Sequence, residues 1–500
     1  MRLKYGDMAK ETDETYNHVL KYTGIFGGVQ GLNIGMGLVR TKLIALLLGP
    51  SGMGLASLFN TTVNFVSQST NLGVSFSAVR HISALFDQGD QAALEHFVKV
   101  VRGWSMLTAL LGMLICILIG PLLSQTTFAW GNHSLHFMLL SPAVGMLAIT
   151  GGETAILKGM RRLGALALVQ ILSVAAALII SVPVYFYFGE SGIVPVIVLM
   201  TLTTMLLTIR HSFRLMPLRL WGSRGILGEG MEMVRLGVAY TLAAVVGSAS
   251  EMLIRSYLNV VGDLDMLGLY NAGYMLTITY AGMVFSAMET DYFPRLSGVH
   301  QDIAATNDCV NRQMEVSLLL LSPMLAGLII ALPILIPLLF SSKFLPVVEM
   351  AQVAALAMYL KVLTMPVAYI TLARGYSLKY LFLETSYYVV FVLLFIIGYE
   401  HWGLYGTGVA ITLAHLFEYL LINGYAYIKY GYRCSATVFQ YAAVQAVLGL
   451  LVFVLTLSTE GITYWSLGTL LVTCSCLFSL QILRRKTHLW QALTRRFHKG

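Results

Sequence analysis

Apolar stretches of about twenty residues follow one another from Ile25 to the C-terminal tail, and each is long enough to cross the hydrocarbon core of a bilayer. Only 11% of the residues are Asp, Glu, Lys or Arg, whereas a soluble protein carries about 25%. Within a bilayer only helices and closed barrels satisfy every backbone group, and continuous runs of this length indicate helices. We therefore expect an all-α polytopic membrane protein with no room for a soluble catalytic domain.

Polar clusters and Gly/Pro clusters divide the chain into fourteen predicted membrane-spanning helices. Their predicted ranges are 22–48, 54–80, 102–124, 136–157, 164–188, 192–209, 236–260, 268–292, 315–340, 347–373, 380–398, 404–428, 437–456 and 464–483. The predicted domains are a cytoplasmic N-terminal segment (1–21), an N-terminal six-helix lobe (22–209), a cytoplasmic linker (210–235), a C-terminal six-helix lobe (236–430), two additional transmembrane helices (437–483) and a basic cytoplasmic tail (484–500).

Positive charge lies almost entirely on one side of this arrangement. Of the 32 Lys and Arg residues, 27 fall in the two terminal segments and in the loops on their side, while the opposite loops hold only Lys343. Cytoplasmic loops retain positive charge during insertion, so both termini are predicted to be cytoplasmic. Topology explains the net charge of +8, and the basic tail does not require a nucleic-acid partner.

A short pattern occurs once in each half of the chain. A glycine at a helix end is followed by a Gly-Leu that opens the next helix, at Gly49 and Gly54 in the first half and at Gly262 and Gly268 in the second. The recurrence of this glycine pattern in both halves of the chain predicts two six-helix bundles related by a pseudo-two-fold axis. Parallel repeats of this kind are typical of secondary transporters in which two bundles rock about a central site.

Four cations fall inside predicted spans: Arg40, Lys42, Arg255 and Lys361. Each costs about 2.5 to 3.5 kcal/mol at mid-bilayer, which favours a functional role. Lys42 precedes Gly49 by seven residues and Arg255 precedes Gly262 by seven, so the repeat places one cation at equivalent depth in each half. For Arg255 an ion pair with Glu251, one helical turn away, is the alternative interpretation.

Polar residues recur every three or four positions in the second span, with apolar residues on the remaining arc. In lipid such a stripe must face protein or water, and carboxamides suit a wetted cavity that binds hydroxyl groups; helix packing through small polar residues is the alternative. The predicted substrate-binding residues are Arg40, Lys42, Arg255, Asn33, Asn60, Asn64, Gln68, Asn71 and Asn271.

Acidic residues and a histidine inside spans are candidates for ion coupling, namely Glu251, His415 and Glu418. His415 and Glu418 lie three residues apart, so they share a helix face and could hold a proton. A packed polar pair is the alternative. The five cysteines lack the spacing of a disulfide framework or a metal site, and there is no P-loop, so neither a metal nor a cofactor is expected.

Four short motifs carry a resemblance to a known family: LGPSGMGL at 48–55, AILKGMRR at 155–162, PRLS at 294–297 and FSSKF at 340–344. From about residue 20 to residue 430 the chain resembles the Wzx-type O-antigen and lipid-linked polysaccharide flippases, a group that includes flippases for the enterobacterial common antigen lipid intermediate. These proteins are part of the multidrug/oligosaccharidyl-lipid/polysaccharide exporter superfamily.

The resemblance implies a function in polysaccharide biosynthesis. A protein of this kind moves an undecaprenyl-diphosphate-linked oligosaccharide, such as an O-antigen unit of lipopolysaccharide, across the bacterial inner membrane by alternating access, without chemical change. Lys42 and Arg255, assisted by Arg40, would bind the diphosphate. The implied partners are the lipid-linked glycan, membrane lipids and other polysaccharide-assembly proteins, with no nucleic acid.

Two alternatives belong to other functional classes. A multidrug antiporter of the same superfamily carries cations and would favour a cavity dominated by carboxylates. A membrane-embedded glycan polymerase or ligase would need a sizeable outer loop with acid or base residues. The longest predicted outer loop, Gln125 to Leu135, has His133 as its one such residue, which argues against this enzyme class.

Overall fold

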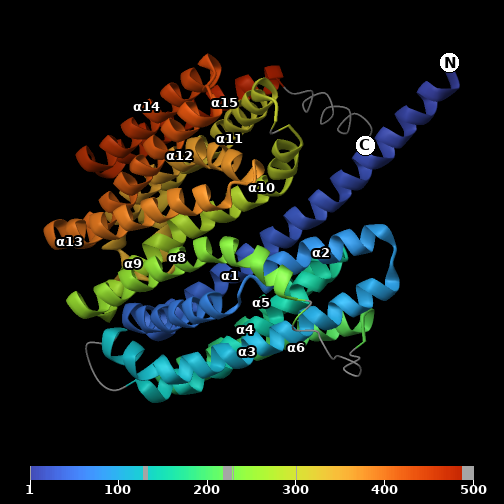
Figure 1. Cartoon of the computed structure of the whole chain (residues 1–500). Helices are drawn as coiled ribbons and strands as arrows, with labels where there is room; N and C mark the ends of the chain where they lie inside the picture. Colours follow the sequence, from blue (N-terminus) through green and yellow to red (C-terminus); the bar gives the residue numbers. More distant parts are fainter. Residues whose placement is uncertain (1, 128–132, 218–227, 229, 300, 487–500) are drawn as a thin grey trace, which may run out of the picture. The chain divides into compact units, whose positions relative to one another are not determined.

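The computed structural model describes residues 2–127, 133–217, 228, 230–299 and 301–486, and for residues 2–34 and several short stretches it describes the backbone alone. Every regular element in this part of the chain is a helix, which confirms the predicted all-α class (Figure 1). Nine helical segments of the described chain are long and apolar enough to cross a membrane, and two of them, Gly164–Leu215 and Ser377–Tyr430, each contain two of the predicted spans. The predicted spans coincide with helices, except that the span predicted as 54–80 is interrupted by a turn at residues 71–73.

The chain divides into two compact units. The first unit comprises Met1–Leu48 and Phe59–Thr241, and the second comprises Gly49–Leu58 and Leu242–Gly500. The predicted lobe boundaries and the two-fold relation between the halves stay predictions. One helix, α1, contributes to both units, because its middle segment 49–58 groups with the second.

The helices of the first unit are α1 (Arg2–Thr70), α2 (Val74–Gln88), α3 (Gln91–Thr127), α4 (Ser134–Gly159), α5 (Leu163–Phe188), the short 3-10 turn η1 (Gly189–Gly192) and α6 (Ile193–Leu215). Helix α4 is the central element, since it packs against α2, α3 and α6 (Figure 1). Its inward residues include fully buried Phe137 and Leu140, which fix the helix against its neighbours.

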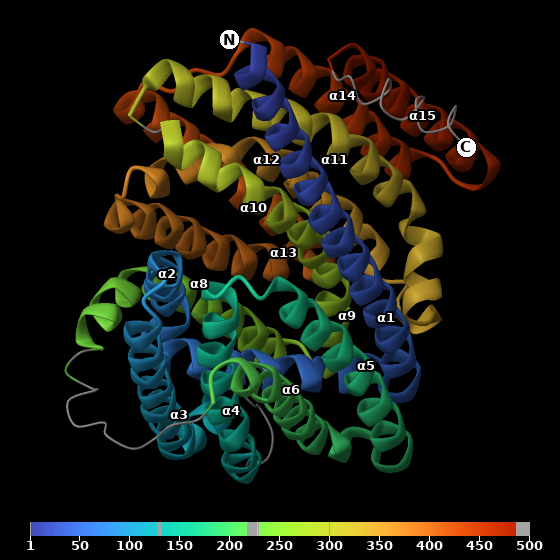
Figure 2. The same ribbon diagram turned by 90° about the vertical axis from the view of Figure 1, so that its right-hand side faces the viewer.

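Helix α8 (Met231–Val261) leads from the first unit into the second. It is followed by α9 (Leu264–Tyr274), the π-helical η2 (Met275–Thr279), α10 (Tyr280–Val299), α11 (Ile303–Leu339), η3 (Ser342–Phe344), α12 (Val347–Ala373), α13 (Ser377–Tyr430), α14 (Ala436–Ser458) and α15 (Gly461–Lys486). Helix α12 packs against α11 and α13. In its most apolar stretch 72% of the residues are buried, the largest share among the nine segments. The hairpin of α14 and α15 packs on α11 (Figure 2).

Two long helices are broken by glycines that adopt a left-handed backbone. Gly49 has φ 67° and precedes Pro50, which lacks the N–H needed to continue the hydrogen-bond ladder. Gly403 has φ 56° and divides α13 into the two spans predicted for it. A third break is a correction to the sequence prediction, because α1 ends at Thr70 and α2 starts at Val74, within the span predicted as 54–80.

The glycines of the Gly-Leu pattern lie where two backbones touch inside the second unit. A Cβ on Gly54 of α1 would overlap the carbonyl oxygen of Leu264, and a Cβ on Gly268 of α9 would overlap the carbonyl oxygen of Pro50. Only glycine permits this approach. The pattern found in the sequence therefore has a packing role.

Candidate functional site

A polar cluster surrounds Arg255 in the second unit. The Arg255 side chain is 7% exposed, and its Nη1 lies 3.1 Å from Oε2 of Glu251. Its Nε donates to Ser57 Oγ at 3.1 Å, and that hydroxyl donates to Asn271 Oδ1 at 2.9 Å. The guanidinium also lies 5.5 Å from the centroid of the Tyr274 ring. The structure thus brings Arg255, Glu251 and Asn271 together, and it contains the ion pair considered as the alternative for Arg255.

Three carboxamides line one face of α1 in the first unit. Asn60, Asn64 and Gln68 follow at intervals of four residues and are exposed, while Val63 and Val66 on the other arc are 3% exposed. We call these three residues the carboxamide face. Asn71 lies beyond the end of α1 and is only half-buried; its Nδ2 donates to Ser75 Oγ at 2.9 Å, so it belongs to the turn into α2.

Arg40 is half-buried in the first unit among neutral groups. Its Nε lies 3.4 Å from Ser181 Oγ on α5, and its Nη2 lies 3.2 Å from Met200 Sδ on α6. Within the described residues no carboxylate pairs with Arg40. Lys42 is half-buried two residues further along α1. The side chain of Asn33, also predicted as a binding residue, lies outside the described part.

A second charged cluster in the second unit joins α12 and α13. Lys361 Nζ lies 3.0 Å from Oε1 of Glu418, whose side chain is 2% exposed. The other carboxylate oxygen, Oε2, lies 4.0 Å from Nε2 of His415 and has no hydrogen-bond partner in the described part. The Tyr387 hydroxyl lies 3.4 Å from His415 Nδ1. His415 and Glu418 therefore share a face of α13, and Glu418 contacts Lys361 of α12, a partner that the sequence did not assign to it.

One buried ion pair was not identified from the sequence. Glu153 of α4 is 4% exposed, and both of its oxygens accept from Arg102 of α3, at 2.8 and 3.2 Å. Arg102 also donates to the Met216 carbonyl at 2.9 Å, beyond the end of α6. A carboxylate inside an apolar span indicates that a cation must neutralise it. The sequence does not show which cation does so, because Arg102 lies 51 residues away in the chain. The geometry makes this pair a structural tie between three helices.

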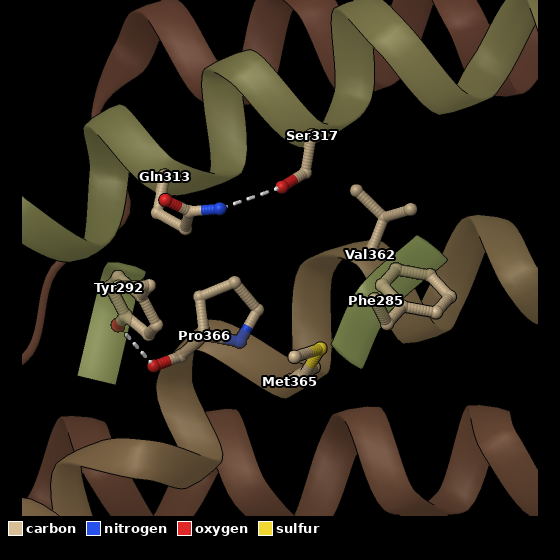
Figure 3. Close-up of a pocket in the computed structure, with 7 residues that line it drawn as sticks. All are labelled: Phe285, Tyr292, Gln313, Ser317, Val362, Met365 and Pro366. Atoms are coloured by element: carbon tan, nitrogen blue, oxygen red, sulfur yellow. Dashed lines mark hydrogen bonds between the residues drawn. The ribbon is translucent and has the colours of Figure 1, made fainter. Parts of the chain in front are cut away.

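A small pocket of the second unit forms beside Pro366 of α12. The Tyr292 hydroxyl donates to the Pro366 carbonyl at 2.6 Å, and Gln313 Nε2 donates to Ser317 Oγ at 3.3 Å (Figure 3). Its lining contains no charged side chain. A diphosphate needs cations, so this pocket does not fit such a group.

The helical arrangement is that of solved membrane transporters. It is similar to the structure of the lipid II flippase MurJ in an inward closed conformation, with a TM-score of 0.70 and 14% identity over 92% of this chain and 98% of that one. It is also similar to a multidrug resistance MATE family transporter of the MOP superfamily in its inward-facing conformation, with a TM-score of 0.68 and 13% identity over 79% and 94% of the two chains. The fold is therefore that of a multi-pass helical membrane protein.

The profile of the polysaccharide biosynthesis protein family matches residues 43–349, which is more than half of the chain. The chain belongs to this family. It is also 22% identical over 387 residues to the lipid III flippase of Escherichia coli strain K12 and to that of Shigella flexneri, covering 74% of this chain and 88% of each relative. These relatives agree with the resemblance stated from the four sequence motifs.

Proposed function

We propose that this protein is a flippase that moves an undecaprenyl-diphosphate-linked oligosaccharide, an O-antigen unit or a related surface polysaccharide unit, from the cytoplasmic to the periplasmic leaflet of a bacterial inner membrane. Both termini lie in the cytoplasm in this proposal. Membership of the polysaccharide biosynthesis family and the similarity to lipid III flippases support the substrate class. The transporter fold supports movement by alternating access.

The observation that carries the proposal is the carboxamide face of α1. Asn60, Asn64 and Gln68 are exposed on a helix that is apolar enough to span a membrane. Such groups are costly against lipid, and their exposure supports a water-filled passage along this face of α1. Amides donate and accept hydrogen bonds, which suits the hydroxyl groups of a glycan, while a polyprenyl tail can stay in lipid.

Charge pairing favours an anionic substrate over the cations of a multidrug antiporter. Glu251, Glu418 and Glu153 each have a basic partner, in Arg255, Lys361 and Arg102 respectively. These carboxylates are therefore neutralised within the protein. Arg40, in contrast, has only neutral partners in the described part, so positive charge is available to a diphosphate.

Three cations are proposed to bind the diphosphate: Arg40, Lys42 and Arg255. The structure supports a larger role for Arg40 in binding the diphosphate, because no described carboxylate offsets its charge. Arg255 is held by Glu251, whose side chain is 42% exposed and free to turn away when a diphosphate replaces it. The expectation that Lys42 and Arg255 face one another stays a prediction.

The Lys361 cluster is proposed as the ion-coupling site, with His415 and Glu418 as the groups that exchange a proton. Support comes from Glu418 Oε2, which is buried without a hydrogen-bond partner in the described part and lies 4.0 Å from His415 Nε2. A proton placed on this oxygen would weaken the attraction between Glu418 and Lys361. Glu251, which pairs with Arg255, is the third candidate for coupling.

Reconstitution tests the function directly. Purified protein in vesicles receives a fluorescent lipid-linked oligosaccharide in one leaflet, without ATP, and quenching by an impermeant reagent reports exchange between leaflets. We expect exchange with an unchanged glycan mass, and an Asn64→Leu, Gln68→Leu double variant should lose it. Leu46→Ala, at an exposed apolar position of the same helix, is the matched control. A lengthened or transferred glycan would support the polymerase or ligase class instead.

A further inference from the structure

A basic and aromatic cluster lies in the second unit where α12 ends and where both ends of α13 meet. Arg374 follows α12 as its C-cap, and Lys379 lies in the first turn of α13. Tyr376 and Tyr430, from the two ends of α13, stack with centroids 6.3 Å apart and planes 2° apart. We call these four residues the α13-end cluster.

Each cation of the α13-end cluster lies over a tyrosine ring. The Arg374 guanidinium is 4.7 Å from the centroid of Tyr430, and Lys379 Nζ is 4.0 Å from that of Tyr376. Rings attract cations through their quadrupole but do not neutralise them. No described carboxylate pairs with either cation, and Arg374 Nε is buried without a hydrogen-bond partner in the described part. The cluster thus holds two positive charges, and one buried donor of Arg374 is unused.

Acidic residues of the adjacent helix are already engaged. Asn307 of α11 donates to the carbonyl of Gly431, directly after α13, so the start of α11 lies beside the cluster. There Asp302 caps α11 by accepting from backbone N–H groups, and Asp308 pairs with Arg312 at 2.9 Å. Neither of these two carboxylates pairs with Arg374 or Lys379, which leaves both cations open to an anion from outside the described part of the chain.

Exposed apolar side chains flank the cluster. Leu378 and Phe382 at the start of α13 are 73% and 70% exposed, and Tyr427 and Ile428 at its end are 61% and 76% exposed. In a membrane protein such side chains contact acyl chains. None of these four side chains carries a carboxamide that could bind the hydroxyl groups of a glycan. The surroundings suit a ligand that combines a phosphate with acyl chains and carries no glycan.

We propose that the α13-end cluster binds the phosphate of an anionic phospholipid such as phosphatidylglycerol. Arg374 supplies a planar fork of donors and Lys379 a compact charge, while Leu378 and Phe382 contact the acyl chains. The charge pattern of the sequence predicts this end of the unit to face the cytoplasmic leaflet. This inference goes beyond the proposed flippase activity and does not depend on it.

Lipid titration of the full-length protein tests the site. Delipidated protein in neutral detergent is titrated with phosphatidylglycerol, and native mass spectrometry counts bound lipid. An Arg374→Gln, Lys379→Gln double variant should weaken the apparent affinity about tenfold or more, since each surface cation contributes substantially to anionic lipid binding. Arg312→Gln, which removes an exposed cation of α11, should leave the affinity unchanged. Equal affinity of the double variant and the parent would overturn the proposal.

Two further experiments separate loss of lipid binding from loss of folding and identify the bound ligand. Tyr430→Phe retains the ring and should bind as the parent does, whereas Tyr430→Leu should bind more weakly at an unchanged melting temperature; full binding by Tyr430→Leu would contradict the site. Millimolar inorganic phosphate should fail to displace the lipid, because it lacks acyl chains. Full displacement by phosphate, or stronger competition by the lipid-linked oligosaccharide than by phosphatidylglycerol itself, would assign the cluster to another ligand.

Discussion

At the scale of single residues, the functional argument depends on which intramembrane charges are neutralised inside the protein. Spacing within one helix identified the Glu251–Arg255 pair, because residues four apart share a face. Spacing could not identify Lys361 as the partner of Glu418, since they lie 57 residues apart on two helices. Sequence therefore locates the charged groups, while the structure decides which of them are available to a substrate.

Alanine variants of the cations should reduce export. Arg40→Ala, Lys42→Ala and Arg255→Ala are each expected to lower it by about tenfold or more, because a hydrogen bond to a charged group contributes about 1.5 to 3 kcal/mol. Arg40→Ala should be at least as severe as Arg255→Ala, since Glu251 already offsets part of the Arg255 charge. Lys42→Arg should be milder, as it keeps the charge. Complementation of surface polysaccharide in a deletion strain measures the effect.

Normal membrane levels of each variant and an unaffected Arg312→Ala protein are the controls for this series. Parental export by the Lys42→Ala, Arg255→Ala double variant would refute the diphosphate assignment. If Glu251→Ala restores export to Arg255→Ala, the ion pair was needed to neutralise Glu251, and Arg255 only ties helices together.

At the scale of elements, helices follow from apolar runs more readily than their breaks do. Gly49-Pro50 and Gly403 mark breaks that local chemistry predicts. The break after Thr70 was missed, because Leu72 adopts a positive φ of 52° that its side chain gives no reason to expect. That turn is held by contacts such as the bond from Asn71 to Ser75, which no periodicity reveals.

Glycine substitutions test the crossing of α1 and α9. Gly268→Ala should lower the melting temperature of the purified protein, because its Cβ would overlap the backbone of Pro50 and overpacking costs about 1 to 3 kcal/mol. Gly424→Ala in α13 has no atom within 4 Å of the added carbon and should melt at the parental temperature or above. Equal melting temperatures for the two variants would show that the crossing is looser than described.

At the scale of the whole molecule, the predicted orientation can be tested by thiol labelling. In two variants that each keep a single cysteine, either Ser191→Cys or the native Cys434, an impermeant maleimide added to intact spheroplasts should label Ser191→Cys, an exposed position between α5 and α6. The exposed native Cys434 between α13 and α14 should react only after permeabilisation. The opposite pattern would reverse the predicted topology.

The pH dependence of this labelling provides an internal check. Although Cys434 is exposed as a residue, partial burial of its thiol raises the pKa above its ordinary value, with a smaller opposing effect from the Tyr432 hydroxyl. Because the thiolate is the reactive form, labelling of permeabilised spheroplasts should be slow at neutral pH and accelerate as the pH rises. A rate independent of pH would contradict this environment.

Helix α1 contributes residues to both units, which limits how the halves of two homologous proteins can be recombined. A crossover in the linker between the halves, the natural place to join two homologous genes, would transfer residues 49–58 together with the first half, although they pack as part of the second unit. A chimera built this way would insert a foreign segment against α9, where glycine backbones touch. Hybrid proteins should therefore tolerate exchange of the second half only when this ten-residue insert is exchanged with it.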